Sequence, residues 1–251
     1  MSVVAVRYSE GFDRYERFGG RDVWPEYNLH GDVLNRYWSR LYDVFPEYQF
    51  VLYDQEAGEV LAEGHTIPVV WDGTTDSLGP GIDVSIQGGF ELQATKGTPS
   101  ALCALAAEIP TRNRDRRLAV VILEQMAEVA RSAELRWLIA PARPNWKDRY
   151  PLTPIERYVT WRTVRGEPFD PWIRVHTRMG GKIEEPIPES LRITGTVAEW
   201  ESWTGMAFPE PAEYVFPGGL ATVSIDLQAN TGSYWEPNVW IVHSIAGRVV
   251  A

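Results

Sequence analysis

The sequence predicts a mixed fold of the α/β or α+β class, in which helices flank one sheet. Short apolar or alternating segments, typical of strands, occur before, between and after segments in which apolar residues have helical spacing. The clearest unit spans residues 101–144, where an apolar run, an arginine-rich loop, an amphipathic segment and a second apolar run follow one another. Hydrophobic residues make up 44% of the 251 residues and charged residues 23%, which is ordinary for a globular chain and argues against disorder.

The first segments predict a strand and a helix. Residues 3–6 form a short apolar run. Asp32 stands where it can cap a helix, and Pro46 ends that helix. Spacings of four, three and four place one apolar face on it, made of Leu34, Trp38, Leu41 and Phe45.

A hairpin follows this helix. Residues 48–53 and 59–71 are strand-like, and the turn between them ends in Gly58. Residues 82–86 alternate apolar and polar side chains, which predicts a short edge strand, and residues 88–100 are expected to form a loop.

The central unit predicts an anion site. Residues 101–107 are an apolar strand, Pro110 ends it, and residues 136–141 are the next strand. Between them, a helix begins at Leu118, and its predicted apolar face consists of Leu118, Val121, Ile122, Met126 and Val129. The loop before this helix carries four guanidinium groups, on Arg112, Arg114, Arg116 and Arg117. Free backbone N–H groups, the helix dipole and the arginines all favour a phosphate at that point.

Beyond residue 144 the pattern changes to loops and later strands. Residues 147–154 form a long loop, and residues 158–164 are a strand or a short helix. A helix is expected from Pro171 to the Gly180-Gly181 pair, with Trp172, Val175 and Met179 on one side. Three later segments are expected to be strands, at residues 191–197, 222–227 and 239–242.

Several classes of function are disfavoured by composition. The formal net charge of −10 argues against nucleic-acid binding, which needs a positive field. No apolar run is long enough to span a membrane, and no signal peptide is apparent. Cys103 is the only cysteine, so no intramolecular disulfide forms and a cytoplasmic location is expected. The four histidines show no ligand spacing, so no metal site is expected.

The central unit resembles the GNAT superfamily, the GCN5-related N-acetyltransferases. That family binds acetyl-coenzyme A through a loop of pattern Arg/Gln-x-x-Gly-x-Gly/Ala. Residues 114–119 keep the leading Arg114 and the closing Ala119 but place Arg117 at the internal glycine. Glycine lets the backbone approach the pyrophosphate, whereas an added guanidinium supplies charge in its place.

Longer sequence segments are similar to the GNAT-like domains of polyketide synthase loading modules and their free-standing relatives. These segments are residues 143–158, 195–206 and 236–240, and the resemblance covers about residues 48–243. It implies a single domain over residues 1–251, with an extended N-terminal segment (1–45) and a C-terminal extension (183–251). It also implies a mixed, mostly antiparallel central sheet flanked by helices, with a split between the two central strands.

The resemblance assigns roles to individual residues. Coenzyme A would be bound by Arg112, Arg114, Arg116, Arg117, Leu118 and Ala119. His176 is a candidate general acid near the coenzyme sulfur, and Asn145 a hydrogen-bond donor to the thioester carbonyl. Glu108 is a candidate general base that deprotonates an amine through water. Each also has a structural reading: a solvated arginine turn, a histidine within a helix, a turn residue and a strand-end glutamate. His65 and Asp83 are further groups near the predicted hairpin.

The implied function is an acyl-CoA-dependent acyltransferase, which moves an acetyl group from acetyl-CoA, or another acyl group, directly to an amine. One alternative is malonyl-CoA decarboxylation, with or without S-transfer to an acyl carrier protein, and another is a coenzyme A-binding protein without catalysis. The expected partner is a small-molecule acyl acceptor or a carrier protein, with no nucleic acid and no membrane. The pattern indicates neither the acceptor nor the oligomeric state.

Overall fold

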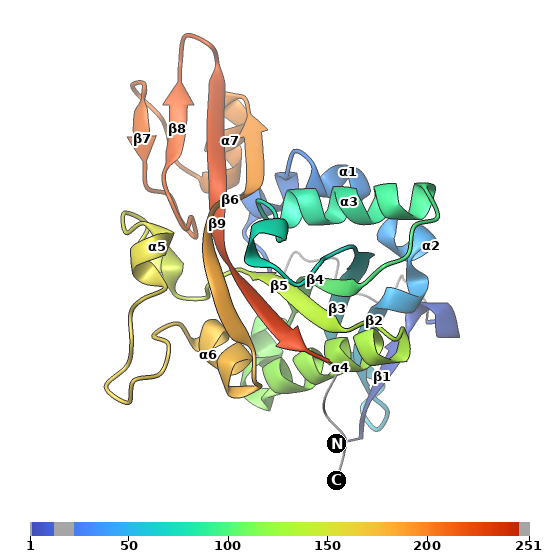
Figure 1. Ribbon diagram of the computed structural model, residues 1–251. Coiled ribbons are helices and arrows are strands. Elements are labelled where there is room, and N and C mark those ends of the chain that lie inside the picture. Colours follow the sequence, from blue (N-terminus) through green and yellow to red (C-terminus); the bar gives the residue numbers. More distant parts are fainter. Residues whose placement is uncertain (1, 13–22, 246–251) are drawn as a thin grey trace.

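The computed structural model describes residues 2–12 and 23–245, and their nine strands form one sheet (Figure 1). The strand order is β1-β2-β3-β4-β5-β9-β8-β7, and β6 also pairs with β9. All pairs are antiparallel except the parallel pair β4–β5. The strands are β1 (Val3–Arg7), β2 (Gln49–Asp54), β3 (Glu59–Val69), β4 (Ala101–Glu108), β5 (Trp137–Ala142), β6 (Lys182–Gly195), β7 (Ala212–Tyr214), β8 (Val223–Asp226) and β9 (Thr231–Ser244).

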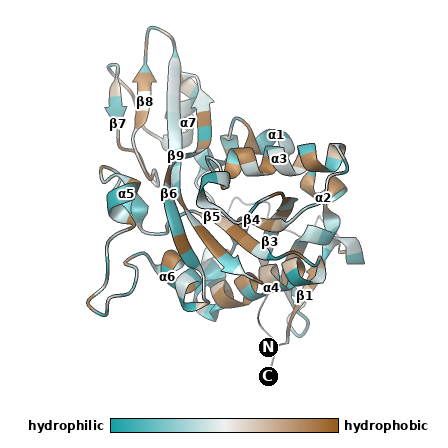
Figure 2. Cartoon of the chain, in the orientation of Figure 1, coloured by the Kyte–Doolittle hydropathy of each residue, from teal (hydrophilic) through white to brown (hydrophobic). Residues whose placement is uncertain are grey.

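Helices cover both faces of the central strands (Figure 1). They are α1 (Leu34–Trp38), α2 (Leu41–Val44), α3 (Ile82–Ala94), α4 (Leu118–Ser132), α5 (Ile155–Tyr158), α6 (Pro171–Arg178) and α7 (Val197–Thr204). Neighbouring residues of β4 point to opposite faces: Cys103 packs in the core that contains α3, and Leu102 in the core that contains α4. Figure 2 shows hydrophobic stretches along the central strands, whereas the helices carry both hydrophobic and hydrophilic residues.

The two central strands separate after three paired residues. Ala101, Leu102 and Cys103 of β4 pair with Trp137, Leu138 and Ile139 of β5. Beyond this point β4 continues to Glu108 beside β3, and β5 continues to Ala142 beside β9. The split predicted between the two central strands is therefore present, and the mixed, mostly antiparallel fold is confirmed.

The predicted hairpin is confirmed, but the predicted N-terminal helix is not continuous. Two short helices, α1 and α2, replace it, although Leu34, Leu41 and Phe45 are buried as expected. Asp32 does not cap α1, because its carboxylate accepts hydrogen bonds from the backbone and hydroxyl of Thr194 on β6. A contact distant in sequence thus replaces the local cap.

Residues 82–94 form helix α3, so the edge strand at 82–86 and the loop that was expected to start at residue 88 are wrong. Ile82, Ile86 and Phe90 lie four residues apart and are buried on one face. The alternation over five residues was too short to distinguish this face from a strand.

Smaller corrections concern exposure and element type. On α4, Val121 is exposed, and Leu123 and Ala130 are buried beside the other predicted residues. Helix α5 ends at Tyr158, and most of residues 159–164 are neither strand nor helix. The predicted later strands are present: β6 and β9 begin earlier in the chain than expected, and β8 is shorter than the predicted segment at 222–227. The predicted helix at Pro171 is α6. No helix within residues 2–12 and 23–245 has the length and apolar character needed to cross a bilayer.

Candidate active site

A cavity of about 820 Å³ opens where β4 and β5 separate. Residues 104–109 line one side of it and residues 140–143 another. All three predicted catalytic residues, Glu108, Asn145 and His176, lie on its wall. Its volume is within the range of about 300–1,000 Å³ that is usual for small-molecule sites. The split in the sheet therefore creates a ligand-sized space that brings the predicted residues together.

Only part of the arginine loop lines this cavity. Residues Thr111–Arg116 form a 3-10 turn, and the side chain of Asn113 fixes it by donating a hydrogen bond to the Leu61 carbonyl (2.9 Å). Arg114 and Ala119 line the cavity. Arg116 instead pairs with Glu59 (3.0 Å). The predicted binding residue Leu118, the first residue of α4, has its side chain buried in the core between α4 and the sheet. The first turn of α4 has no side-chain cap, which leaves its N–H groups available to an anion.

Arg117 occupies the glycine position of the family pattern in a glycine-like conformation. Its φ of 57° and ψ of 24° lie in the left-handed region, where an L-residue costs roughly 1–2 kcal/mol. We expect Arg117→Gly to have a free energy of unfolding about 1 kcal/mol above that of Arg117→Ala, because both remove the guanidinium and only glycine removes the strain. Urea unfolding of the two variants measures this difference. Equal stabilities would show that the left-handed conformation carries no cost here.

Helix α6 presents His176 to the cavity because Asp170 anchors its start. One carboxylate oxygen of Asp170 accepts hydrogen bonds from the backbone N–H groups of Trp172 and Ile173. The other accepts from the Trp146 backbone and the Tyr158 hydroxyl, both at 2.9 Å. The Asp170-Pro171 pair is therefore an N-cap followed by a proline at the first helical position, which links α6 to the loop after β5.

His176 is buried and paired with a second imidazole. Its Nδ1 lies 2.9 Å from Nε2 of His243 on β9, and its Nε2 has no hydrogen-bond partner among the described residues. Burial, reinforced by His243, lowers the pKa of His176 well below its usual value, so the ring is neutral at physiological pH. Gly181 permits this arrangement, because a Cβ there would lie 2.7 Å from the His243 ring. His176 therefore offers the cavity a neutral imidazole.

Glu108 ends β4 with its carboxylate almost completely buried. Its Oε1 accepts a hydrogen bond of 2.7 Å from the indole N–H of Trp24, and its Oε2 lies 3.8 Å from Nε2 of His65. The same His65 nitrogen lies 3.5 Å from Glu63. Glu63, His65 and Glu108 come from adjacent strands and share one face of the sheet, since Glu63 is opposite Glu108 in the β3–β4 register.

The two carboxylates determine the charge of His65. Burial alone lowers its pKa, but Glu108 and Glu63 outweigh burial and raise the pKa to about 9. Because the pKa in the folded chain lies above the ordinary 6.5, the contribution of His65 to stability is complete below about pH 6.5 and disappears as the pH rises through about 9. At neutral pH the imidazole is thus a cation between two anions.

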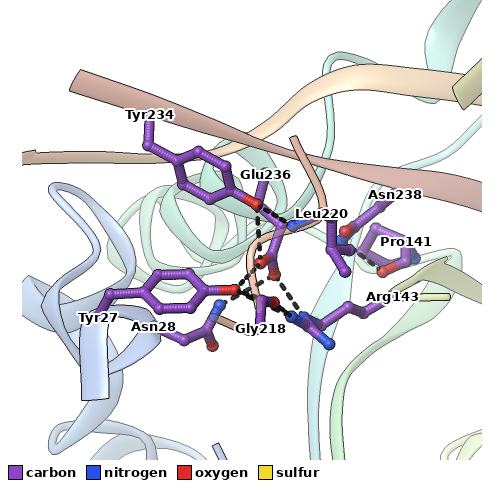
Figure 3. A network of polar contacts seen from close by, with 9 residues as sticks. All are labelled: Tyr27, Asn28, Pro141, Arg143, Gly218, Leu220, Tyr234, Glu236 and Asn238. Carbon is purple, nitrogen blue, oxygen red and sulfur yellow. Dashed lines mark hydrogen bonds and ion pairs between the residues drawn. The ribbon is translucent and has the colours of Figure 1, made fainter. Parts of the chain in front are cut away.

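A polar network holds together another part of the cavity wall (Figure 3). Glu236 on β9 accepts hydrogen bonds from Arg143 Nε (2.8 Å), Asn28 Nδ2 (2.9 Å) and the Tyr27 hydroxyl (3.1 Å). Arg143 also donates to the Tyr27 hydroxyl and to the Gly218 carbonyl, both at 3.0 Å. Burial, together with the charge of Glu236, raises the pKa of Tyr27 far above its usual value, so its hydroxyl stays protonated. The network joins the N-terminal segment, the end of β5 and β9.

Sequence reasoning missed several wall residues and misplaced others. Trp146 and Trp172 line the cavity, whereas Trp71 and Trp161 do not. Asp83 is held in α3, where it accepts a hydrogen bond from the backbone of β6. The missed wall residues are Trp24, Asn28, Trp38, Arg143, Glu236 and Asn238. Arg143, Glu236 and Asn238 lie in the sequence segments that carried the family resemblance. That resemblance was the signal in the sequence from which these wall residues could have been found.

Comparison with known proteins agrees with this geometry. No family model matches the chain. An arginine N-acetyltransferase from Aspergillus versicolor is 29% identical over 249 residues, which cover 89% of this chain and 86% of that protein. The loading GNATL domain of CurA from Lyngbya majuscula has a TM-score of 0.59 at 17% identity, with 97% of each chain covered. The GphF GNAT-like decarboxylase, solved in complex with isobutyryl-CoA, has a TM-score of 0.55 at 17% identity, with 98% of this chain and 100% of that chain covered.

The separation of β4 and β5, the arginine turn at the start of α4 and these structural neighbours lead to the same conclusion. The chain has the GNAT fold, and its resemblance to the GCN5-related N-acetyltransferases, and to the GNAT-like domains of loading modules, is confirmed.

Proposed function

We propose that this protein is an acyltransferase that moves an acetyl group from acetyl-CoA directly to the amine of a small molecule. The observation that carries the proposal is the position of Glu108: a carboxylate at the end of β4, facing the cavity that opens between the separated strands. The 29% identical relative, an arginine N-acetyltransferase, supports an amine acceptor and makes arginine the first acceptor to test.

Two parts of the cavity support a position for the cosubstrate. The free N–H groups at the start of α4 and the guanidinium of Arg114 would hold the phosphates of acetyl-CoA. The pantetheine arm would lie along residues 104–108 of β4, whose edge no longer pairs with β5. Leu102 and Cys103 are excluded from this role, because β5 already occupies their edge.

In the proposed reaction, Glu108 accepts a proton from the acceptor ammonium through a water molecule. The free amine then attacks the thioester carbonyl, so that a C–N bond forms, the C–S bond breaks, and the proton lost from the nitrogen passes to the leaving sulfur to give free coenzyme A. Asn145, exposed at the cavity mouth, would donate a hydrogen bond to the carbonyl oxygen. The neutral imidazole of His176 would hydrogen-bond the leaving sulfur through its unpartnered Nε2.

A second candidate is decarboxylation of malonyl-CoA, with or without transfer of the acyl group to a carrier-protein thiol. The observation in its favour is that Asn145 and His176 line the same cavity. A hydrogen-bond donor and an imidazole are the groups that would stabilise and then protonate an enolate.

One experiment separates these functions. The protein is incubated with acetyl-CoA or malonyl-CoA, each with and without arginine, other amines or a carrier protein, and the products are followed by mass spectrometry. Free coenzyme A with N-acetylated product, formed only when an amine is present, supports the proposal. Acetyl-CoA formed from malonyl-CoA alone supports decarboxylation. Tight binding of both thioesters without turnover indicates a coenzyme A-binding protein and contradicts both proposals.

The arginine turn makes a separate prediction about binding. Arg114→Ala combined with Arg117→Ala should weaken coenzyme A binding about tenfold per guanidinium and reduce its salt dependence, because each arginine lost removes a charge-assisted contact worth about 1.4 kcal/mol. Isothermal titration at two salt concentrations measures both effects. Arg116→Ala is the matched control, because that arginine already pairs with Glu59. Equal effects of the control and the double variant would contradict the proposed phosphate site.

A further inference from the structure

The two oxygens of the Glu108 carboxylate have different neighbours. Oε1 is held by the Trp24 indole, whereas Oε2 faces Nε2 of His65 at 3.8 Å. That nitrogen also faces Glu63 at 3.5 Å. Both separations are ion-pair distances and exceed the length of a hydrogen bond. The imidazole therefore acts on Glu108 through charge rather than through a directional bond.

The surroundings of His65 strengthen this charge interaction. Its side chain is fully buried, and the rings of Trp38 from α1 and Tyr42 from α2 lie 4.9 and 5.7 Å from its ring. Within residues 2–12 and 23–245, the charged groups facing it are Glu63 of its own strand and Glu108 of the neighbouring strand. With aromatic rings on the remaining side, water screens the cluster little, and charges a few ångströms apart interact strongly.

We propose that His65 is a positioning residue for the general base: as an imidazolium it holds Glu108 in the carboxylate form, and Glu63 keeps the imidazole charged. The role of the carboxylate in catalysis rests on the function proposed above, whereas the charge state of the cluster does not. No covalent step involves His65. It acts only on the proton affinity of Glu108, which accepts the proton of the substrate through water.

The first test is the pH profile of kcat/KM. His65→Gln should move the acidic limb about 1–2 pH units upward, because Glu108 without its cationic neighbour takes up a proton at higher pH. Activity should then fall about 10- to 100-fold at a pH on the acidic limb and approach the wild-type value near pH 9. Glu63→Gln should move the same limb downward, since it removes an anion beside Glu108. A purely structural role would lower activity by the same factor at every pH.

The second test does not depend on activity. Nuclear magnetic resonance of isotopically labelled histidine should show the His65 ring protonated at pH 7 and losing its proton near pH 9. Glu108→Gln and Glu63→Gln should each move this titration to lower pH. These variants keep the assay informative if His65→Gln does not fold. The control is His30→Gln, since His30 stacks on Trp203 and does not line the cavity.

Three outcomes would overturn the inference: a neutral His65 at pH 7, an unchanged acidic limb in folded His65→Gln, or a stoichiometric transition metal in the purified protein that His65→Gln loses. The last would mean that the imidazole coordinates an ion instead of carrying a proton. If the wild type acetylates no amine but His65 is a cation, the proposed function fails and the charge state of the cluster stands.

Discussion

Glu108→Gln is expected to lower kcat about 10²–10⁴-fold, the usual contribution of a positioned general base. Glutamine keeps the size of the side chain and an oxygen that can accept the hydrogen bond from the Trp24 indole, so the wall of the cavity should be preserved. It cannot accept a proton from an ammonium ion. The affinity for coenzyme A should change little, because the proposed phosphate site lies at the start of α4. Steady-state kinetics with the acceptor identified by mass spectrometry, together with titration of coenzyme A, measures both quantities.

Two comparisons make this result specific to the carboxylate. Glu91→Gln is the matched control, because Glu91 lies on the exposed side of α3 and contacts Gln87. Acceptors of lower amine pKa, which present more free base, should lose less rate in Glu108→Gln than arginine does. A kcat within about threefold of wild type with every acceptor would remove Glu108 from the mechanism. Undiminished decarboxylation of malonyl-CoA by the same variant would favour the second candidate function.

The sequence predicted the secondary structure best in segments whose conformation depends on neighbouring residues in the chain. Pro110 separates an apolar run from an arginine turn, and Leu118 then starts a helix, so β4, α4 and β5 follow from periodicity and breakers alone. The Asp170-Pro171 pair likewise predicts the start of α6 from two adjacent residues. Glu108 lies on β4, Arg114 in the turn before α4 and His176 on α6, which explains why these three predicted residues line one cavity.

Tertiary contacts override local signals elsewhere. Helix α3 contains Gly88 and Gly89, which normally indicate a break. Gly89 is required because a Cβ there would lie 2.4 Å from the Ile67 side chain, so the helix packs closely on β3 at this point. Asp32 similarly serves a distant partner, Thr194, instead of capping the helix that follows it. Ile67 and Thr194 are too far away in the sequence to be included in a short window around Gly89 or Asp32.

The same limit explains the missed parts of the site. His65 meets Glu108 only through the β3–β4 register, and Arg143 meets Glu236 across 93 residues of sequence. Such residues pair because the topology of the sheet brings them together, and the periodicity of apolar residues in the sequence does not specify that topology. The family resemblance nevertheless drew attention to residues 143–158 and 236–240, and these two segments contain the two partners of the Arg143–Glu236 pair.

Glu236→Gln is expected to cost about 3–5 kcal/mol of the free energy of unfolding, the usual effect of breaking a buried ion pair from one side. The carboxylate accepts four hydrogen bonds, from Arg143, Asn28, Tyr27 and Tyr234, and only 2% of the residue is exposed. Without it, the guanidinium of Arg143 is left largely buried without an anion. Urea unfolding monitored by circular dichroism measures the loss of free energy. In thermal unfolding, the same loss should lower the melting temperature by about 10 °C.

The double variant distinguishes an ion pair from a packing defect. Arg143→Met combined with Glu236→Gln should be more stable than the sum of the two single effects by about 1–3 kcal/mol, because removing both charges leaves neither unpaired. Glu167→Gln is the matched control: its bond to Arg178 is exposed, and its loss should cost no more than about 1 kcal/mol. A Glu236→Gln cost no larger than that of the control, or strictly additive effects in the cycle, would mean that the charge of Glu236 does not hold the cavity wall together. The hydrogen bonds that Arg143 and Tyr27 donate to the Gly218 carbonyl would then be the contacts that fix this wall.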